Sequence, residues 1–223
     1  MPVYNEAATI REIVAKVLAV PLDIELVIID DASSDATGDI LRDEISVISD
    51  RIKILHHTVN QGKAAAIRTG IPHTTGDIIT IQDGDLETEP NDLIHLTEPI
   101  RNGEASVVYG SRYLNPKEPH LYRFYQIGGR LLSWTVNLLY GQHITDEPAC
   151  YKVFRADILR SVTLEYDRFE FCPEVTAKVS KMGYKIKELP MNYYPRSFAE
   201  GKKLNWKDGV KAIWVLWKYR FVK

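Results

Sequence analysis

The chain has 223 residues, of which 45% are hydrophobic and 26% are charged, as is usual for one globular domain with a sizeable core. Its formal net charge of −2 gives no general sign of a nucleic-acid partner, and its two cysteines, Cys150 and Cys172, are too few for a disulfide framework. No apolar stretch approaches the roughly 20 residues that span a bilayer, so we expect a protein that is soluble or lies on a membrane surface.

The first half of the chain is predicted to alternate helices with buried strands. Ile10, Ile13, Val14 and Val17 have the spacing of one buried helix face, and short β-branched runs are typical of buried strands. Strands are expected at 24–29, 52–55 and 78–81, and further helices at about 38–45 and 60–70. This alternation is typical of a parallel α/β sheet, in which right-handed crossovers bring the strand ends to one edge.

The second half continues the pattern less regularly. Helices are expected at about 91–101 and 126–140, from about 169 and from about 205, strands at 105–109 and 184–189, and a polar loop at 145–152.

Three carboxylates, Asp83, Asp85 and Glu87, stand at every second position directly after the strand at 78–81. In an open α/β sheet, ligands bind beyond the carboxyl ends of the strands. Crowded carboxylates repel one another unless a cation holds them, and oxygen ligands suit Mg2+ or Mn2+ with positions left open for phosphates. The alternative is a solvated acidic turn.

Five ordered motifs resemble family 2 glycosyltransferases, most closely the dolichol-phosphate mannose synthase-like branch. They are Pro2-Val3-Tyr4-Asn5-Glu6, Asp30-Asp31-Ala32-Ser33-Ser34-Asp35-Ala36-Thr37, Asn60-Gln61-Gly62-Lys63, Gln82-Asp83-Gly84-Asp85-Leu86-Glu87 and Gly110-Ser111-Arg112-Tyr113. The resemblance implies the GT-A fold, a single Rossmann-like α/β domain over 1–204 with a mostly parallel central sheet and flanking helices. An amphipathic helix over 205–223 would follow. The family has an apolar strand before the first motif, where only Met1 stands here, so the first strand is expected to be missing or truncated.

The resemblance also implies a donor site for a nucleotide diphosphate sugar, either a GDP- or a UDP-hexose. Pro2, Tyr4 and Glu6 would contact the nucleoside, and Asp30 or Asp31 its base. Lys63 and Gly84 belong to the same implied set. Mg2+ or Mn2+ on Asp83, Asp85 and Glu87 would bridge the diphosphate and neutralise the leaving group, with Asp85 as a catalytic residue.

For the acceptor, the resemblance implies a polyprenyl phosphate and inversion at the sugar. A phosphate monoester is nearly dianionic at neutral pH and needs a cluster of cations, arginines above all, instead of a general base. The candidates are Arg112, Arg123, Arg130, Arg196 and Lys202, with a solvated surface charge as the alternative for Arg130. Asp146 and Glu174 match acidic family positions near the acceptor. Each would be a base for a hydroxyl acceptor, or would orient the sugar or the arginines, and Glu174 could instead cap a helix.

The predicted terminal helix has an aromatic side. One arc of it contains Trp206, Val210, Ile213, Trp214, Trp217 and Phe221, bordered by Lys207, Lys211 and Lys218. Residues 196–223 contain eight Lys/Arg and two Asp/Glu. Such a helix suits a membrane interface and predicts a peripheral location at the cytoplasmic membrane face. The alternative is a helix packed on the core with its lysines reaching solvent.

Two other functions stay open at this point. The first is a family 2 transferase that uses a saccharide or another hydroxyl acceptor, and the second is an inactive nucleotide-sugar-binding remnant without its first strand.

Overall fold

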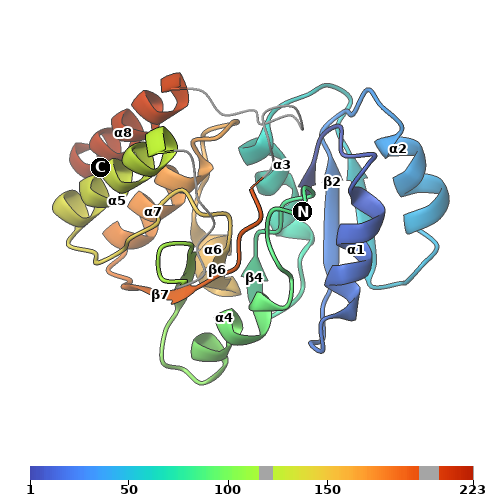
Figure 1. The fold of residues 1–223 in the computed structure, drawn as a ribbon, viewed down its shortest axis with the longest axis horizontal. Helices are drawn as coiled ribbons and strands as arrows, with labels where there is room; N and C mark the ends of the chain where they lie inside the picture. Colours follow the sequence, from blue (N-terminus) through green and yellow to red (C-terminus); the bar gives the residue numbers. More distant parts are fainter. Residues whose placement is uncertain (116–122, 196–205, 223) are drawn as a thin grey trace.

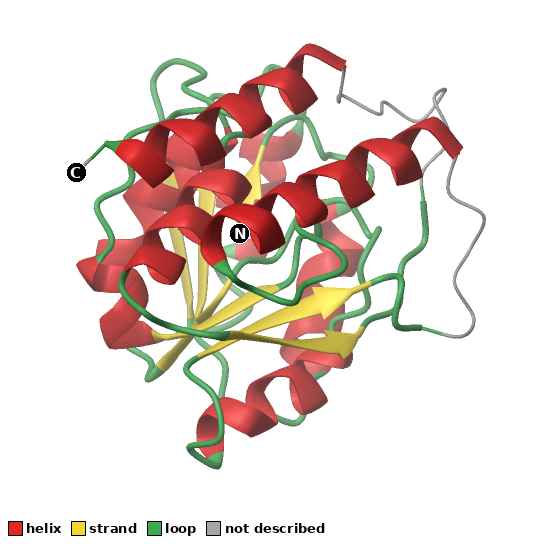
Figure 2. Ribbon diagram, turned by 90° about the vertical axis from the view of Figure 1, so that its left-hand side faces the viewer, coloured by secondary structure: helices red, strands yellow, loops and turns green. Residues whose placement is uncertain are grey.

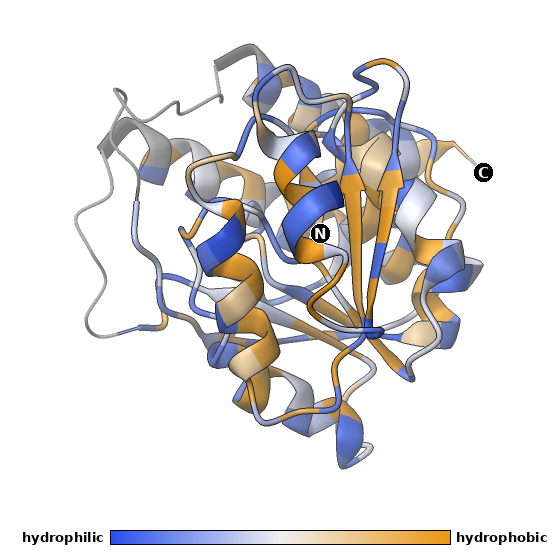
Figure 3. Ribbon diagram, turned by 90° about the vertical axis from the view of Figure 1, so that its right-hand side faces the viewer, coloured by the Kyte–Doolittle hydropathy of each residue, from blue (hydrophilic) through white to orange (hydrophobic). Residues whose placement is uncertain are grey.

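The computed structural model describes residues 1–115, 123–195 and 206–222, and it contains two hydrogen-bonded sheets with helices packed around them (Figure 1). The first sheet is parallel, with strand order β1-β2-β3. The elements of this half are β1 (Pro2–Val3), α1 (Ile10–Ala19), β2 (Leu26–Asp30), α2 (Thr37–Ile40), the π-helical turn η1 (Leu41–Ile45) and β3 (Ile52–His56). Every residue of β2 is buried, and Figure 3 shows the strands of this sheet as mostly hydrophobic ribbons.

The second sheet is mixed, with strand order β4-β6-β5-β7. β6 runs antiparallel to both its neighbours, whereas β5 and β7 are parallel. The elements of this half are α3 (Lys63–Gly70), the 3-10 turn η2 (Ile71–His73), β4 (Ile78–Thr80), α4 (Asp92–Arg101), β5 (Val107–Ser111), α5 (Arg123–Tyr140), β6 (Lys152–Arg155), α6 (Ala156–Ser161), α7 (Phe171–Lys181), β7 (Ile186–Pro190) and α8 (Trp206–Phe221). The predicted α/β class is confirmed, but hydrogen bonding divides the strands into two sheets.

Strand β6 corrects the sequence analysis, which placed Lys152 in a polar loop. Lys152 is fully buried in the strand. Its Nζ donates to the carbonyl oxygens of Glu147 (2.5 Å) and Ala149 (3.0 Å) and lies 4.1 Å from the centre of the Tyr109 ring. A buried ammonium is tolerated here because backbone carbonyls and an aromatic face replace its water.

A cavity of about 840 Å3 lies between β2 and β4. Side chains of both strands and of α3 line it, among them Val27, Ile29, Ile67 and Ile79. Met1 forms part of its wall, and the Met1 ammonium donates to the Val27 carbonyl oxygen at 2.7 Å. Burial lowers the pKa of this ammonium to about 5. The cavity thus lies between the parallel sheet and the mixed sheet.

Helices α5, α7 and α8 form one layer of the domain, and the two long helices in front in Figure 2, α5 and α8, lie side by side. Helix α8 packs on the core through Ala212, Val215, Leu216 and Tyr219. The Tyr140 hydroxyl at the end of α5 donates to the Leu216 carbonyl oxygen at 2.6 Å. Within the described ranges, no helix is both long and apolar enough to cross a membrane.

Candidate active site

The ends of β1 and β2 are connected through the loops that follow them. The Asn5 amide donates to Ser33 Oγ at 2.9 Å, and the Glu6 amide donates to Thr37 Oγ1 at 2.9 Å. Asn5 has a φ of 55°, a conformation that asparagine tolerates better than most residues do. Polar side chains after β2 therefore hold the chain segment of the first motif in place, and Tyr4 is half-buried within it.

Asp30 and Asp31 at the end of β2 are both buried but have different partners. Asp31 Oδ1 accepts from the Gln61 amide (2.9 Å) and Oδ2 from the Gly62 amide (2.7 Å), and His57 Nδ1 lies 2.7 Å from Oδ1. Asp31 thus anchors the loop that leads into α3. Asp30 Oδ2 lies 3.2 Å from Nδ1 of His56, whose side chain is 47% exposed. Asp30 is therefore the aspartate of the pair that lies nearer to solvent. Neither histidine pairing has a signal in the sequence, because each joins residues that are 26 positions apart.

The predicted donor residues Glu6 and Gly84 lie next to each other. Thr9 Oγ1 donates to the Gly84 carbonyl oxygen at 2.7 Å and contacts Glu6 Oε2 at 3.1 Å. A Cβ placed on Gly84 would lie 3.5 Å from the Glu6 and Val3 side chains. The first motif therefore lies against the acidic motif after β4.

The acidic motif is partly neutralised by a lysine. Lys63 Nζ, at the start of α3, lies 2.6 Å from Asp83 Oδ1. Burial alone would raise the pKa of Asp83, but the Lys63 charge, hydrogen bonds from Cys150 and Lys63 and the N-terminal charge together lower it, so Asp83 stays ionised. The Glu87 amide donates to Asp85 Oδ1 at 3.2 Å, and Glu87 Oε2 accepts from the Tyr193 hydroxyl at 2.8 Å.

These carboxylates have the right chemistry for a divalent cation, because they are hard oxygen donors at a strand end. Among the described residues, however, no three His, Cys, Asp or Glu side chains are gathered closely enough to hold a metal. In this structure Asp83 pairs with Lys63, and Glu87 accepts a hydrogen bond from the Tyr193 hydroxyl through Oε2.

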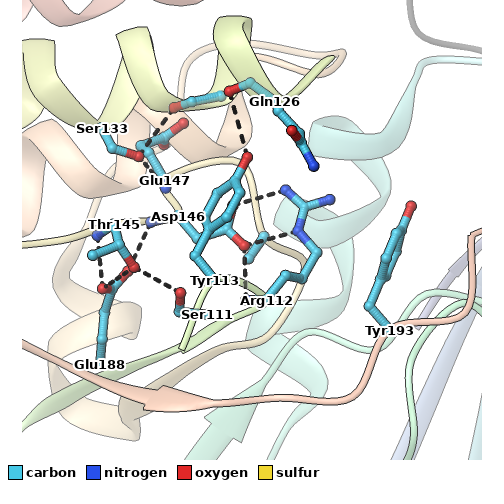
Figure 4. A network of polar contacts seen from close by, with 12 residues as sticks. Ser111, Arg112, Tyr113, Gln126, Ser133, Thr145, Asp146, Glu147, Glu188 and Tyr193 are labelled. Carbon is cyan, nitrogen blue, oxygen red and sulfur yellow. Dashed lines mark hydrogen bonds and ion pairs between the residues drawn. The ribbon is translucent and has the colours of Figure 1, made fainter. Parts of the chain in front are cut away.

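The end of β5 carries the best-defined ion pair of the site (Figure 4). Arg112 Nε donates to Asp146 Oδ2 at 2.8 Å and Nη2 to Asp146 Oδ1 at 2.7 Å. The Arg112 amide also donates to Asp146 Oδ2, at 2.9 Å. Asp146 is fully buried, whereas the Arg112 side chain is 15% exposed. Both carboxylate oxygens are thus occupied, while the guanidinium keeps Nη1 for another partner.

The loop that carries Asp146 is itself held from two sides (Figure 4). Glu188 of β7 accepts from the Thr145 amide at 2.7 Å and from the Asp146 amide at 3.0 Å. The Glu147 amide donates to Ser133 Oγ of α5 at 2.9 Å. Burial raises the pKa of Glu188. Since these contacts fix the backbone on both sides of Asp146, they also fix the direction of the Arg112 guanidinium.

The other predicted cations are less well placed by the structure. Arg130 of α5 is exposed, and its Cζ lies 5.2 Å from the centre of the Tyr113 ring, which belongs to the fifth motif. The side chain of Arg123, and residues Arg196 and Lys202, lie outside the described residues.

Glu174 is a correction to the predicted site. It is fully buried, and its Oε1 accepts from the Glu165 amide (2.7 Å), Lys178 Nζ (2.7 Å) and the Tyr219 hydroxyl (3.0 Å). Glu174 therefore connects α7, α8 and the loop before α7 instead of facing an acceptor. It does lie in the first turn of α7, as the capping alternative proposed, but apart from Lys178 in the same helix its partners belong to other segments.

Comparison with known proteins agrees with this geometry. The family model described as "Glycosyl transferase family 2" matches residues 1–163. The chain belongs to glycosyl transferase family 2. It is therefore a glycosyltransferase, as the five motifs predicted.

Three curated relatives of this family 2 chain are named as polyprenyl-phosphate sugar transferases. The undecaprenyl-phosphate mannosyltransferase of Micrococcus luteus is 25% identical over 91% of this chain and 85% of its own length. The dodecaprenyl-phosphate galacturonate synthase of Rhizobium johnstonii is 27% identical, and the dolichol-phosphate mannosyltransferase of Pyrococcus furiosus is 25% identical. Each of these two matches covers 91% of this chain. This chain spans 60% of the length of the Rhizobium protein and 57% of the length of the Pyrococcus protein.

Solved structures confirm the GT-A fold. Glucosyl-3-phosphoglycerate synthase from Mycobacterium tuberculosis, in complex with Mn2+, UDP-glucose and phosphoglyceric acid, superimposes with a TM-score of 0.72 at 18% identity, over all of this chain and 78% of that one. A mannosyltransferase from Pyrobaculum calidifontis, in complex with GDP-mannose and Mn2+, has a TM-score of 0.59 at 22% identity, over 85% of this chain and 53% of that one.

Proposed function

We propose that this family 2 glycosyltransferase moves a hexose, with inversion, from a nucleotide diphosphate sugar to a polyprenyl phosphate at the cytoplasmic membrane face. The curated relatives with this type of acceptor support the proposal. The observation that carries it is the pairing of Arg112 with a fully buried Asp146.

That pairing supports a phosphate acceptor over a hydroxyl acceptor. A hydroxyl acceptor needs a general base that can reach its proton. Asp146 uses both oxygens on Arg112, and Glu174 is buried among structural partners, so neither is available as a base. A phosphate acceptor needs instead an oriented cation. Asp146 supplies the orientation, and Arg112 supplies the charge and the remaining N–H groups.

On the donor side, Pro2, Tyr4 and Glu6 would bind the nucleoside, and Asp30 would accept a hydrogen bond from the base. Asp30 is preferred over Asp31 because Asp31 already holds two backbone amides. Lys63 would lie beside the diphosphate, since it reaches the same surface as Asp83. A bound divalent cation would offset the charge that develops on the leaving nucleoside diphosphate. Asp85 and Glu87 are its preferred ligands, with Asp83 joining if Lys63 turns to the phosphates.

In this arrangement the residues of the chain bind and orient both substrates. Arg112 would hold the acceptor phosphate so that one of its oxygens faces the anomeric carbon on the side opposite the leaving group. Arg196, Lys202, Arg123 and Arg130 are the further cations proposed for the same phosphate. Orientation of this kind contributes to the rate because it replaces the entropy loss of bringing the two reactants together.

Kinetics of arginine variants test the phosphate acceptor. Loss of one charge-assisted hydrogen bond costs roughly 1.5 to 3 kcal/mol, so Arg112→Ala and Arg196→Ala should each lose about 10- to 100-fold in kcat/KM for polyprenyl phosphate. Nucleoside diphosphate binding, measured by calorimetry, should stay unchanged. Arg155→Ala is the matched control, because Arg155 pairs with Asp157 on the surface. Unchanged acceptor kinetics in both variants would favour the hydroxyl-acceptor alternative.

The membrane part of the proposal rests on an exposed apolar face formed by α5 and α8. It consists of Ile127, Leu131, Trp134 and Leu138 on α5 and Val210, Trp214, Trp217 and Phe221 on α8. Both sets follow the spacing i, i+4, i+7, i+11, which places each on one side of its helix. The two helices are adjacent on the outside of the domain (Figure 2). Eight exposed large apolar side chains on one face are far more than a soluble surface needs.

This face has the composition of a membrane interface. It contains three tryptophans, and α5 has no acidic residue, while the sequence of α8 has four basic residues, Lys207, Lys211, Lys218 and Arg220, against one acid, Asp208. The predicted aromatic arc of α8 is thus left exposed, since the helix packs on the core through its other side. Ile213 is the exception, being partly buried, and the side chains of Trp206 and Lys207 lie outside the described residues.

Vesicle binding tests this face. Trp134→Glu and Trp214→Glu should each reduce sedimentation with vesicles that contain anionic lipid, because a carboxylate replaces an apolar ring at the surface. The control is Val47→Glu, at a residue that is 77% exposed just after η1. Helix α2, which runs into η1, lies on the opposite side of the molecule from α5 and α8 (Figure 1). Equal sedimentation of all three variants would contradict the membrane contact. A stable dimer of the wild type that both tryptophan variants abolish would also contradict it, because a second copy of the chain would then cover this face.

A further inference from the structure

Tyr193 lies between the two halves of the proposed site, in a segment that no motif of the sequence analysis covers. Its hydroxyl donates to Glu87 Oε2 at 2.8 Å, and the Arg112 Cζ lies 4.9 Å from the centre of its ring. Figure 4 shows the ring beside the Arg112 guanidinium, on the side away from Asp146. One side chain thus contacts a residue of the acidic motif with its polar end and the acceptor arginine with its face.

The backbone holds Tyr193 at this position. The Tyr194 amide donates to the Glu87 carbonyl oxygen at 2.8 Å, and Thr88 and Tyr193 form an isolated antiparallel bridge. The segment after β7 is therefore attached to the acidic motif after β4 by main-chain contacts. Because these contacts do not depend on the phenol, changing the side chain should leave the segment in place.

We propose that Tyr193 is a positioning residue that couples the donor side of the site to the acceptor side. Its hydroxyl fixes the position of the Glu87 carboxylate, a proposed metal ligand, and its ring fixes the plane of the Arg112 guanidinium that would bind the acceptor phosphate. This inference rests on the proposed function for the two substrates, but the coupling itself is a property of three side chains of this chain.

The hydroxyl and the ring of Tyr193 can be removed separately by substitution. A hydrogen bond to a carboxylate is lost in Tyr193→Phe, while the ring and its attraction for the guanidinium remain. In Tyr193→Leu both interactions are lost.

The first test needs no substrate. Urea unfolding midpoints are measured for the wild type, Tyr193→Phe, Glu87→Gln and the double variant, and likewise for Tyr193→Leu with Arg112→Lys. We expect each double variant to lose less than the sum of its two single variants, because the second change removes an interaction that is already gone. Additive midpoints in both cycles would overturn the coupling, whatever any transfer assay shows.

The second test separates positioning from general stability. Tyr193→Phe should weaken Mn2+-dependent binding of a nucleoside diphosphate about 10-fold, with the KM for polyprenyl phosphate unchanged. Tyr193→Leu should in addition raise that KM roughly 3- to 10-fold. Tyr194→Phe and Tyr194→Leu are the controls, since the Tyr194 side chain is 56% exposed. Equal losses of both affinities in Tyr193→Phe would overturn the assignment. Coupled midpoints in a chain without transfer activity would support the coupling and count against the proposed function.

Discussion

Replacing Asp146 by asparagine tests whether this residue orients an arginine or acts as a base. The Asp146→Asn variant keeps the volume and one carbonyl oxygen, but it loses the negative charge and presents an NH2 group to the Arg112 guanidinium. Asp146 is fully buried and Arg112 is only 15% exposed, so solvent cannot replace the lost charge. Breaking a buried pair costs about 3 to 5 kcal/mol. For a chain of this size, we therefore expect the melting temperature to fall by roughly 6 to 15 °C.

The effect on transfer follows from the same contacts. Once Arg112 is no longer held, about one charge-assisted hydrogen bond to the acceptor is lost, or roughly 10- to 100-fold in kcat/KM for polyprenyl phosphate. The pH dependence of the remaining activity should be the same as in the wild type, because no proton acceptor has been removed. The assays are calorimetric unfolding and steady-state kinetics between about pH 5 and 9.

A surface pair provides the matched control. Asp157 makes the same bidentate contact with Arg155, at 2.6 and 2.8 Å, but both side chains are about half exposed or more. Asp157→Asn should cost no more than about 1 kcal/mol and leave transfer unchanged. The orienting role of Asp146 would be refuted by an Asp146→Asn variant that melts like the wild type, loses more than about 1,000-fold in kcat and loses the acidic limb of its pH profile.

Three further predictions concern the metal and the cavity between the sheets. Asp85→Asn should abolish transfer without a change in melting temperature, and wild-type activity that survives excess chelator would contradict a metal role for the acidic motif. Extending the chain before Met1 by about five apolar, β-branched residues should fill the cavity beside Val27 and raise the melting temperature on the order of 10 °C, because several side chains would be buried at roughly 1.5 to 3 kcal/mol each. An equally long Gly/Ser extension should not, and an equal rise with both would contradict this account of the cavity. The buried Met1 ammonium has its pKa lowered from 8.0 to about 5, so the unfolded chain binds more protons in that window and stability should rise from pH 5 to pH 8. Urea unfolding across this range should show the slope, and its persistence after the apolar extension would exclude Met1 as the source.

The parts of the fold that the sequence predicts are those with local signals. The run from Leu26 to Ile29 is apolar throughout, and α1 repeats its apolar residues at helical spacing, so both are recognisable from neighbours in the chain. Strand β6 is not, because four residues bounded by Lys152 and Arg155 have no visible period. Its burial depends on carbonyl oxygens and an aromatic ring supplied by the fold.

The same distinction applies to the site. The motifs predict that polar residues meet at the strand ends, but they do not predict the partner of each. The pairs Lys63–Asp83, Arg112–Asp146 and Tyr193–Glu87 join residues 20, 34 and 106 positions apart. Glu174 shows the reverse case. It stands at a position that resembles an acidic family position, but its carboxylate accepts hydrogen bonds from buried groups of the fold. Tyr193 has no sequence signal beyond its place after a strand, and its role depends on contacts that only the fold creates.

The proposed function requires an acceptor that is a lipid phosphate held by an oriented arginine. The most direct measurement incubates the purified chain with a panel of GDP- and UDP-hexoses, Mn2+ or Mg2+, and either a polyprenyl phosphate or the corresponding polyprenol, and identifies the glycolipid by mass spectrometry. We predict a hexosyl phosphate lipid from the phosphate acceptor with at least one donor, and no product from the polyprenol. Transfer to the polyprenol at a comparable rate, or no product from the lipid phosphate with any donor, would contradict the account.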